Sequence, residues 1–456
     1  GLQISGIGSL ISGINFITTI INMRAPGMTF LRMPLFVWTS LMTSIIILLA
    51  FPALTAGLLL LTFDRLFGSH FFDYTMGGNT VIWQHIFWIF GHPEVYLLIL
   101  PAFGVMSEVI SVFSKKRLFG YNSMVFATVL IGFLGFMVWV HHMFTVGLGP
   151  VSNTIFGLST MAIAVPTGIK VFNWLFTMWG GEIHFKTPML FALGFIFSFL
   201  IGGVTGVMVA VPAADYQYHD SYFVVAHFHY TLVGGTVLGL FAGIYYWWPK
   251  MFGKLLDEKW GKVHFWTFVI GVHLTFFLQH FAGFFGMPRR VFTYNPNKIL
   301  ENINFISTIG ALAMTVGIVV FLFNIYKTTK KGTVSPSDPW NGRTLEWSIP
   351  SPPPAYNFAQ IPLIRGYDSY WLEKTAGDGK MPSVEPLGSS IHMPSPSYLP
   401  ILMALSLLIA GLGFIFRGNY SAGLIGLIFF FTLMFIRSFQ QDHGYNLSIG
   451  NRTEEK

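Results

Sequence analysis

One apolar stretch, residues 82–112, reads IWQHIFWIFGHPEVYLLILPAFGVMSEVISV and decides the class of fold. A helix that crosses a bilayer needs about 20 mostly apolar residues, and this run exceeds that length. The run is continuous, whereas the strands of a membrane β-barrel alternate apolar and polar residues over about 10 positions. The stretch therefore predicts a transmembrane helix that tilts or protrudes from the membrane.

Further apolar runs of similar character lie on both sides of this stretch. Together they predict an all-α, polytopic transmembrane helix bundle with about eleven spans. The predicted spans are 4–22, 34–63, 82–112, 121–144, 154–178, 188–212, 222–248, 264–286, 303–326, 398–416 and 421–436.

The composition of the 456-residue chain agrees with a membrane protein. Hydrophobic residues make up 53% and charged residues 10%, whereas a soluble domain carries about a quarter charged residues. This excludes a soluble globular enzyme, a disordered chain and a disulfide scaffold. The net charge of +7 suits cytoplasmic loops and gives no indication of nucleic acid. Because cysteine is absent, any metal must be held by His, carboxylate or Met.

Three parts follow along the chain. Residues 1–327 contain nine predicted spans, and residues 398–456 contain two more spans and a tail. Residues 328–397 are rich in Pro, Lys, Asp and Ser, so an extended, loosely ordered segment outside the membrane is expected there. Lys and Arg are concentrated in the loops on the side of this segment, which makes that side cytoplasmic. Gly1 then lies outside, so an odd number of helices is expected upstream of it.

The first polar group within the membrane is His92-Pro93-Glu94-Val95-Tyr96. His92 and Tyr96 are four residues apart and share one face of a helix, while Glu94 points elsewhere. Pro93 allows a kink. Taken alone, this pattern also fits a buried histidine that is hydrogen-bonded to a tyrosine.

The adjacent histidines His141 and His142 form the second group. They lie about 100° apart on an expected helix, so they can straddle a site. With His92 they offer three imidazoles and no thiolate, which suits copper or zinc. The alternative is a pair at a helix end that faces water.

The third group, His227 and His229, has a spacing that puts the two rings about 200° apart on a helix. They cannot bind one metal, but they can bind two haem irons on opposite faces. Two satisfied buried histidines are the alternative, which requires partners on both faces.

Three further groups complete the candidates. Lys170 lies in an uncharged run, with Thr167 expected on its face, and a buried lysine can pass protons; a lysine that reaches the interface is the alternative. His219 and Asp220 lie in a loop and suit a hard divalent cation. The pair Arg289-Arg290 lies on the same side and suits a carboxylate-bearing ligand or an ordinary interfacial position.

These motifs, in this order and spacing, resemble subunit I of the haem–copper oxidases, and in particular the bacterial cytochrome c oxidases of the aa type with extra C-terminal helices. The resemblance covers about residues 1–330. It rests on the motifs 91–96, 141–142, 166–170, 226–230 and 286–290.

The resemblance implies a role for each residue. His92, His141 and His142 would hold copper, and His227 and His229 would bind a high-spin and a low-spin haem, both of type A. Tyr96 would be linked covalently to His92. Glu94, Lys170 and Thr167, with Ser107, would pass protons. Arg289 and Arg290 would hold haem propionates, and His219 and Asp220 would bind magnesium.

The same resemblance implies a terminal oxidase of the bacterial plasma membrane that reduces dioxygen to water and pumps protons. Its partners would be subunits II and III, a small subunit IV, membrane lipid and cytochrome c, with quinol as the alternative donor. The copper centre that receives the electrons would lie in subunit II. The family's second low-spin haem histidine is absent before His70, so an N-terminal part of the same subunit is expected elsewhere. A haem-free metal or proton transporter is the remote alternative.

Overall fold

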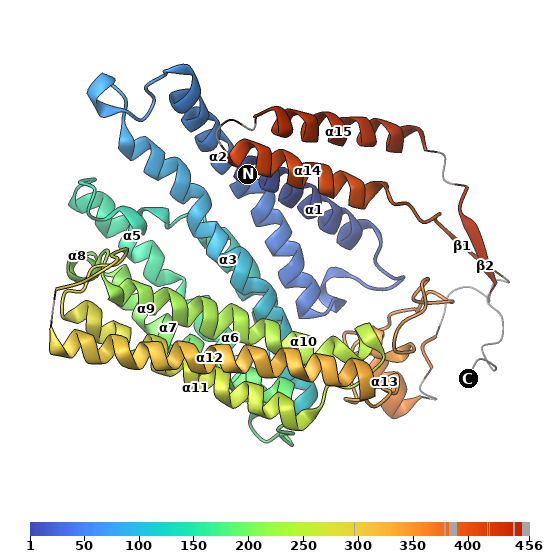
Figure 1. The fold of residues 1–456 in the computed structure, drawn as a ribbon. Coiled ribbons are helices and arrows are strands. Elements are labelled where there is room, and N and C mark those ends of the chain that lie inside the picture. The colour runs from blue at the N-terminus through green and yellow to red at the C-terminus, as the bar shows by residue number, and fades with distance from the viewer. Residues whose placement is uncertain are drawn as a thin grey trace.

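The computed structural model describes residues 1–295, 297–377, 380–382, 390–416, 418, 420–440 and 443–448. Within them the chain is a bundle of long helices, as Figure 1 shows. The apolar helices are α1 (Leu2–Asn22), α2 (Leu35–Phe67), α3 (Thr80–Phe113), α4 (Tyr121–Leu134), α5 (Pro150–Ala162), α6 (Ala164–Met178), α7 (Thr187–Ala210), α9 (Tyr222–Thr231), α10 (Leu238–Phe252), α11 (Glu258–Phe284), α12 (Lys298–Lys331), α14 (Leu399–Ile415) and α15 (Tyr420–Phe439).

The predicted class of fold is confirmed. Nine segments of the described chain are long and apolar enough to span a membrane, and two shorter apolar helices, α4 and α14, complete the eleven predicted positions. Helices α5 and α6 run almost end to end as one span, and so do α9 and α10. The latter two are joined by a π-helical turn, η4 (Leu232–Val237). Turns of this kind are rare and often lie near functional sites.

The predicted span 121–144 is wrong as one continuous helix. Helix α4 ends at Leu134, and the two histidines lie in a separate 3₁₀ turn, η3 (Trp139–Met143). At the break the chain passes the side chain of Tyr96. A Cβ at Gly135 would lie 2.9 Å from a ring carbon of that tyrosine, so only glycine fits this approach.

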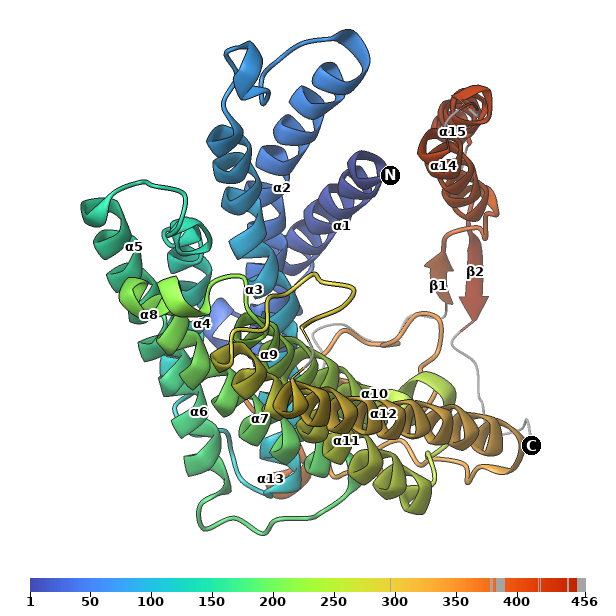
Figure 2. The same cartoon turned by 60° about the vertical axis from the view of Figure 1, so that its left-hand side comes forward.

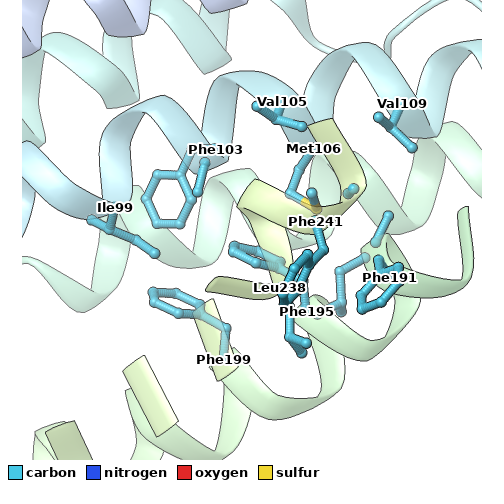
Figure 3. Close-up of a cluster of buried hydrophobic side chains, with 14 of the residues drawn as sticks. Ile99, Phe103, Val105, Met106, Val109, Phe191, Phe195, Phe199, Leu238 and Phe241 are labelled. Atoms are coloured by element: carbon cyan, nitrogen blue, oxygen red, sulfur yellow. The ribbon is translucent and has the colours of Figure 1, made fainter. Parts of the chain in front are cut away.

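Helix α3 crosses the middle of the bundle and supplies much of its core. Figure 3 shows its apolar side chains against those of α7 and α10. The aromatic rings interlock edge to face, for example Phe103 with Phe199 at 5.2 Å between ring centroids. Edge-to-face packing is favourable for the quadrupoles of aromatic rings. The core therefore fixes α3, which carries His92, relative to α7 and α10.

The remaining helices lie around this core. Helix α1 packs on α2, and α11 packs on α12 and α9. Helices α14 and α15 pack on each other and stand to one side of the bundle in Figure 2. In the chain they lie between the two strands of an antiparallel pair, β1 (Ser390–Met393) and β2 (Tyr445–Ser448), which the sequence analysis did not predict.

The segment after α12 is more ordered than expected. Its described part contains η5 (Leu345–Ser348) and α13 (Ser369–Ala376), and Trp347 is completely buried. The Trp347 indole donates to the Tyr246 hydroxyl of α10 at 2.8 Å. Residues 333–377, called the cap below, therefore pack on the ends of the helices instead of remaining loose, because their aromatic side chains are buried there.

Candidate metal and haem site

Three histidines from two separate elements converge on one point. The Nδ1 atom of His92 in α3 lies 3.1 Å from Nε2 of His141 and 3.3 Å from Nε2 of His142, both in η3. Their ligand atoms all lie within 4.8 Å of one another. The lone pairs of ring nitrogens that face one another repel unless a proton or a cation lies between them. The separations fit nitrogen ligands about 2.0 Å from one metal ion.

The 3₁₀ turn is what allows two adjacent histidines to face the same point. At three residues per turn, the rings lie about 120° apart, and the turn itself sits beside α3. The indole of Trp139 donates to Nδ1 of His85 in α3 at 3.1 Å, which fixes η3 against that helix. His85, which the sequence analysis left without a role, is therefore part of the support for the site.

Two further residues orient the histidines of the turn. The ring of His142 stacks on Trp88 with 3.8 Å between centroids. Nδ1 of His141 lies 2.9 Å from Oγ1 of Thr160 in α5, and this hydroxyl donates to a backbone carbonyl. His141 therefore donates from Nδ1 and presents the lone pair of Nε2 to the cluster. The sequence analysis missed both residues. Trp88 precedes His92 by four positions and could have been found from that spacing, but no local signal points to Thr160.

Tyr96 and Glu94 lie on α3 beside the cluster. The rings of His92 and Tyr96 have their centroids 4.7 Å apart, which confirms the predicted shared face. Nε2 of His92 and Oε2 of Glu94 are both buried and have no hydrogen-bond partner among the described residues. Unpaired polar atoms in an apolar interior are costly, so each indicates a group or water that the protein chain does not supply.

His227 and His229 in α9 present their rings in different directions, as predicted. Nδ1 of His227 donates to the Gly202 carbonyl of α7 at 2.9 Å, and Gly206 leaves room for its ring. Nδ1 of His229 donates to the Val225 carbonyl at 2.8 Å, and its ring stacks on Phe276 of α11. In both rings Nε2 is left free of any hydrogen bond within the described chain, as in a histidine that binds a metal.

Lys170 is buried in α6, with 1% of its surface exposed. Its ammonium donates to Thr128 Oγ1 at 2.6 Å and to the Met124 carbonyl at 3.2 Å, both in α4. Thr167 is half-buried, and no hydrogen bond joins it to Lys170. The hydrogen-bond partners of Lys170 therefore come from the neighbouring helix α4. Ser107 accepts from the Trp174 indole at 3.0 Å, one turn along α6 from Lys170.

The polar loops beside α9 bring the remaining candidates together. Nε2 of His219 lies 3.5 Å from Asp220, and Arg289 lies 3.8 Å from the same carboxylate. Arg290 is exposed and adopts a left-handed backbone conformation. Asp215 in α8 (Pro212–Tyr218), a residue the sequence analysis passed over, is buried and lies 3.7 Å from His219. Burial, together with the neighbouring Asp220, raises the pKa of Asp215 to about 7.

Comparison with known proteins identifies the family. The model of the family described as Cytochrome C and Quinol oxidase polypeptide I matches residues 1–313. The chain belongs to this family. The members are haem–copper oxidases, so haem and copper are the cofactors of the family, and the three imidazoles and two free His Nε2 atoms are ligands of the right kind for them.

Relatives match nearly the whole chain. The cytochrome c oxidase subunit 1 of Bacillus sp. (strain PS3) is 61% identical over 98% of this chain and 73% of its own length. That of Bacillus subtilis (strain 168) is 60% identical over 98% of this chain and 72% of its own length. The quinol oxidase subunit 1 of Bacillus subtilis (strain 168) is 51% identical over 100% of this chain and 71% of its own length.

A solved structure agrees on the fold. A haem–copper terminal oxidase dimer, determined by cryo-EM, superposes with a TM-score of 0.57 at 22% identity. The match covers 67% of this chain and 58% of the other. The resemblance stated from the sequence motifs is thus confirmed, and the chain is a multi-pass membrane protein of the haem–copper oxidase family.

Proposed function

We propose that this chain is the subunit of a bacterial plasma-membrane cytochrome c oxidase that holds the dioxygen-reducing site and couples the reaction to proton pumping. The observation that carries the proposal is the convergence of His92, His141 and His142 beside α9. Relatives named cytochrome c oxidase subunit 1 are more similar to the chain than the quinol oxidase relative is, which supports cytochrome c over quinol as the donor.

The three converging imidazoles would hold copper. A set of neutral nitrogen ligands suits copper. When bound, copper and the adjacent haem supply the electrons that reduce dioxygen. The chain's own contribution is to hold Nε2 of His141 and His142 and Nδ1 of His92 at one point, through Thr160, Trp88 and the anchor between Trp139 and His85.

The two histidines of α9 would each hold a haem iron. His227, which interacts electrostatically with His141 and His142, would hold the high-spin haem. His229, on the other face of the helix, would hold the low-spin haem. Haem A is the type we propose for both, in keeping with the aa-type enzymes that the motifs resemble.

Three ionisable residues, with two threonines near one of them, would take up and pass on protons. Glu94 has an unpaired oxygen buried in α3, which suits a group that takes up and releases a proton through water. Tyr96, in contact with His92, would supply a proton and an electron at the site. A covalent bond from a ring carbon of Tyr96 to the free Nε2 of His92 would replace one C–H and one N–H bond, and the two electrons and two protons released would pass to dioxygen. Lys170, with Thr128 as its direct partner and Thr167 nearby in sequence, would serve a second route.

The polar loops would serve the edge of the haems and the contact with the other subunits. Arg289 and Arg290 carry the charge that haem propionates need. His219 and Asp220 would bind magnesium. Two protein ligands are too few for its octahedral shell, so water and subunit II would supply the rest. Subunits II, III and IV, and lipid around the apolar helices, would be the partners, with the electron-receiving copper in subunit II.

The test is the cofactor content of the purified complex with its other subunits. We expect a pyridine haemochrome spectrum of haem A, two haems per complex, and copper in excess of the single ion held by this chain. Copper equal to one ion per complex would favour quinol as the donor. A complex that binds neither haem nor copper would overturn the proposal in favour of a transporter.

A further inference from the structure

Glu108 is a buried carboxyl group that the proposed site does not use. It lies in α3 near the end that meets the cap, and only 6% of its surface is exposed. Its carboxylate faces the backbone N–H groups of Leu35 and Phe36, the first two residues of α2. A carboxylate at a helix N-terminus is stabilised by these unpaired donors. This contact explains how a carboxylate can be buried at this position. It does not explain the small polar cavity beside it.

The cavity has a volume of about 10 Å³ and lies between α3 and the cap. That is close to the space of one water molecule. Glu108 and Ser111 line it from α3, and Arg343, Thr344 and Asp368 line it from the cap. Nε of Arg343, a residue with 9% of its surface exposed, and Oγ1 of Thr344 have no hydrogen-bond partner among the described residues. A buried water is what satisfies such atoms.

The charged and titratable groups that face Glu108 come from the cap and from two helices. They are Glu346, Asp368 and Tyr367 of the cap, Tyr121 of α4 and Tyr246 of α10. The arginines nearby are already engaged, because Arg343 and Arg117 both contact Asp368, at 3.0 and 3.4 Å. Burial, followed by the carboxyl groups of Glu108 and Asp368, raises the pKa of Tyr367 well above its ordinary value, so its phenol remains a hydrogen-bond donor.

A polar face of α3 leads from this cavity toward Lys170. Ser111 lines the cavity, and Ser107, one turn away, accepts the hydrogen bond of Trp174. One turn further along α3 is Phe103. The ammonium of Lys170 lies over its ring, 5.6 Å from the ring centroid. Successive turns of a helix are about 5.4 Å apart, so one water molecule would be enough to bridge the hydroxyl groups of Ser111 and Ser107.

We propose that the cavity between α3 and the cap collects protons from the cytoplasm, and that Glu108 exchanges them with water on the route through Ser111 and Ser107 to Lys170. The carboxylate takes one proton from water, becomes neutral, and gives the same proton to the next water. No other bond changes. The proposal rests on the proposed function, since it requires that protons be consumed at the histidine cluster.

The test uses the complete oxidase complex with Glu108→Gln. The amide keeps the shape of the side chain and still accepts from the N–H groups of α2, but it cannot carry a proton. Each electron added to a buried metal centre needs a compensating proton. We therefore expect reduction of the haem at the copper site, measured anaerobically with excess donor, to slow by about tenfold or more. Haem and copper content remain unchanged, and the inflection that Glu108 contributes to the rate–pH profile disappears.

Controls separate a proton route from a structural role. Glu182→Gln removes an exposed carboxylate of a loop and leaves the rate unchanged. Glu108→Asp restores much of it. Ser111→Ala is expected to slow reduction by about threefold. If the Glu108→Gln complex does not assemble, this variant tests the proton route in its place. Wild-type reduction rates and pH profile in an assembled Glu108→Gln complex, or in Ser111→Ala, overturn the inference. Because the wild-type complex would still contain haem and copper, that outcome is distinct from failure of the proposed function.

Discussion

Two sets of histidines lie in the apolar part of the molecule, and they differ in arrangement more than in burial. His92, His141 and His142 meet at one point from α3 and η3. The α11 histidines, His264, His273 and His280, lie on one helix at intervals of nine and seven residues. At 1.5 Å per residue these intervals place them about 13 and 10 Å apart along the helix axis, too far to share an ion.

Comparison of the two sets shows that a ring nitrogen without a hydrogen-bond partner is not enough to identify a metal site. Nε2 of His264 and Nε2 of His280 lack hydrogen-bond partners in the described chain, as does Nε2 of His92. However, each α11 histidine uses Nδ1 for a neighbour of its own. His264 and His273 contact the hydroxyl groups of Tyr245 and Tyr230 at 3.2 and 2.8 Å. Convergence of several nitrogens is what separates the candidate copper site from these structural histidines.

The largest contrast is expected from His92→Asn. The change removes one of three imidazoles, and the shorter amide cannot reach the shared point. We expect copper bound by this subunit to be lost and turnover to fall by more than about a hundredfold, because even the loss of a supporting residue costs about 10–100-fold. Copper and haem analysis of the purified complex is the measurement. Full copper content in this variant would show that the cluster does not hold the ion.

A smaller effect is expected from Thr160→Val, which keeps the shape of the side chain and removes the hydroxyl that orients His141. The affinity for copper should fall by about 10–100-fold, since the ring loses the partner that fixes its tautomer. Titration with a copper chelator measures it. Ser159→Ala, the neighbouring hydroxyl that bonds only to backbone carbonyls, is the matched control. Equal chelator resistance in Thr160→Val and wild type would contradict the prediction.

His264→Asn makes the same chemical change as His92→Asn in the other set. The side chain is completely buried among aromatic rings, so the variant leaves a cavity and removes the contact with Tyr245. We expect destabilisation by about 1–3 kcal/mol, seen as a lower midpoint of thermal unfolding, with haem and copper content unchanged. Loss of copper or haem from this variant would contradict the prediction, because it would show that a histidine of α11 also supports a metal site.

The smallest effect is expected at the start of α11. Asp257 caps this helix and bonds to Lys327 at 2.6 Å, and the Lys327 bond followed by the backbone N–H of Trp260 holds its pKa below the ordinary value. Asp257→Asn keeps a side chain that can cap the helix and loses only the partly exposed ion pair with Lys327, so it should cost less than about 1 kcal/mol at neutral pH. A lowered pKa stabilises the folded state above about pH 4 and loses this contribution as the pH falls through the folded value. The difference in thermal midpoint between wild type and variant should therefore vanish in acid. A constant difference at all pH values would contradict this.

Much of the fold and part of the site follow from local sequence. The long apolar runs predicted the helices, and the four-residue spacing predicted the contact between His92 and Tyr96. The two-residue spacing likewise predicted that His227 and His229 point to different neighbours. These predictions hold because a helix fixes the relative directions of residues along itself.

The same local reasoning did not extend to contacts between helices. The hydrogen bond from Lys170 to Thr128 of α4 was not predicted, because it joins two separate helices. The break after Leu134 was missed as well, since the apolar run continues through it and the packing of Tyr96 against Gly135 is a long-range contact. The packing of the cap against the helices was not predicted either. Its composition is mostly polar, and only a few aromatic side chains are buried there.

The sequence by itself determined that the protein lies in a membrane, where its helices run, and which residue types offer ligands, since hydropathy and helical spacing are properties of neighbouring residues. Only the tertiary structure decided that three histidines share one point, that Thr160 and Trp88 orient two of them, and that the cap closes over Glu108. These are distances between separate elements, and they depend on how side chains pack across the whole bundle.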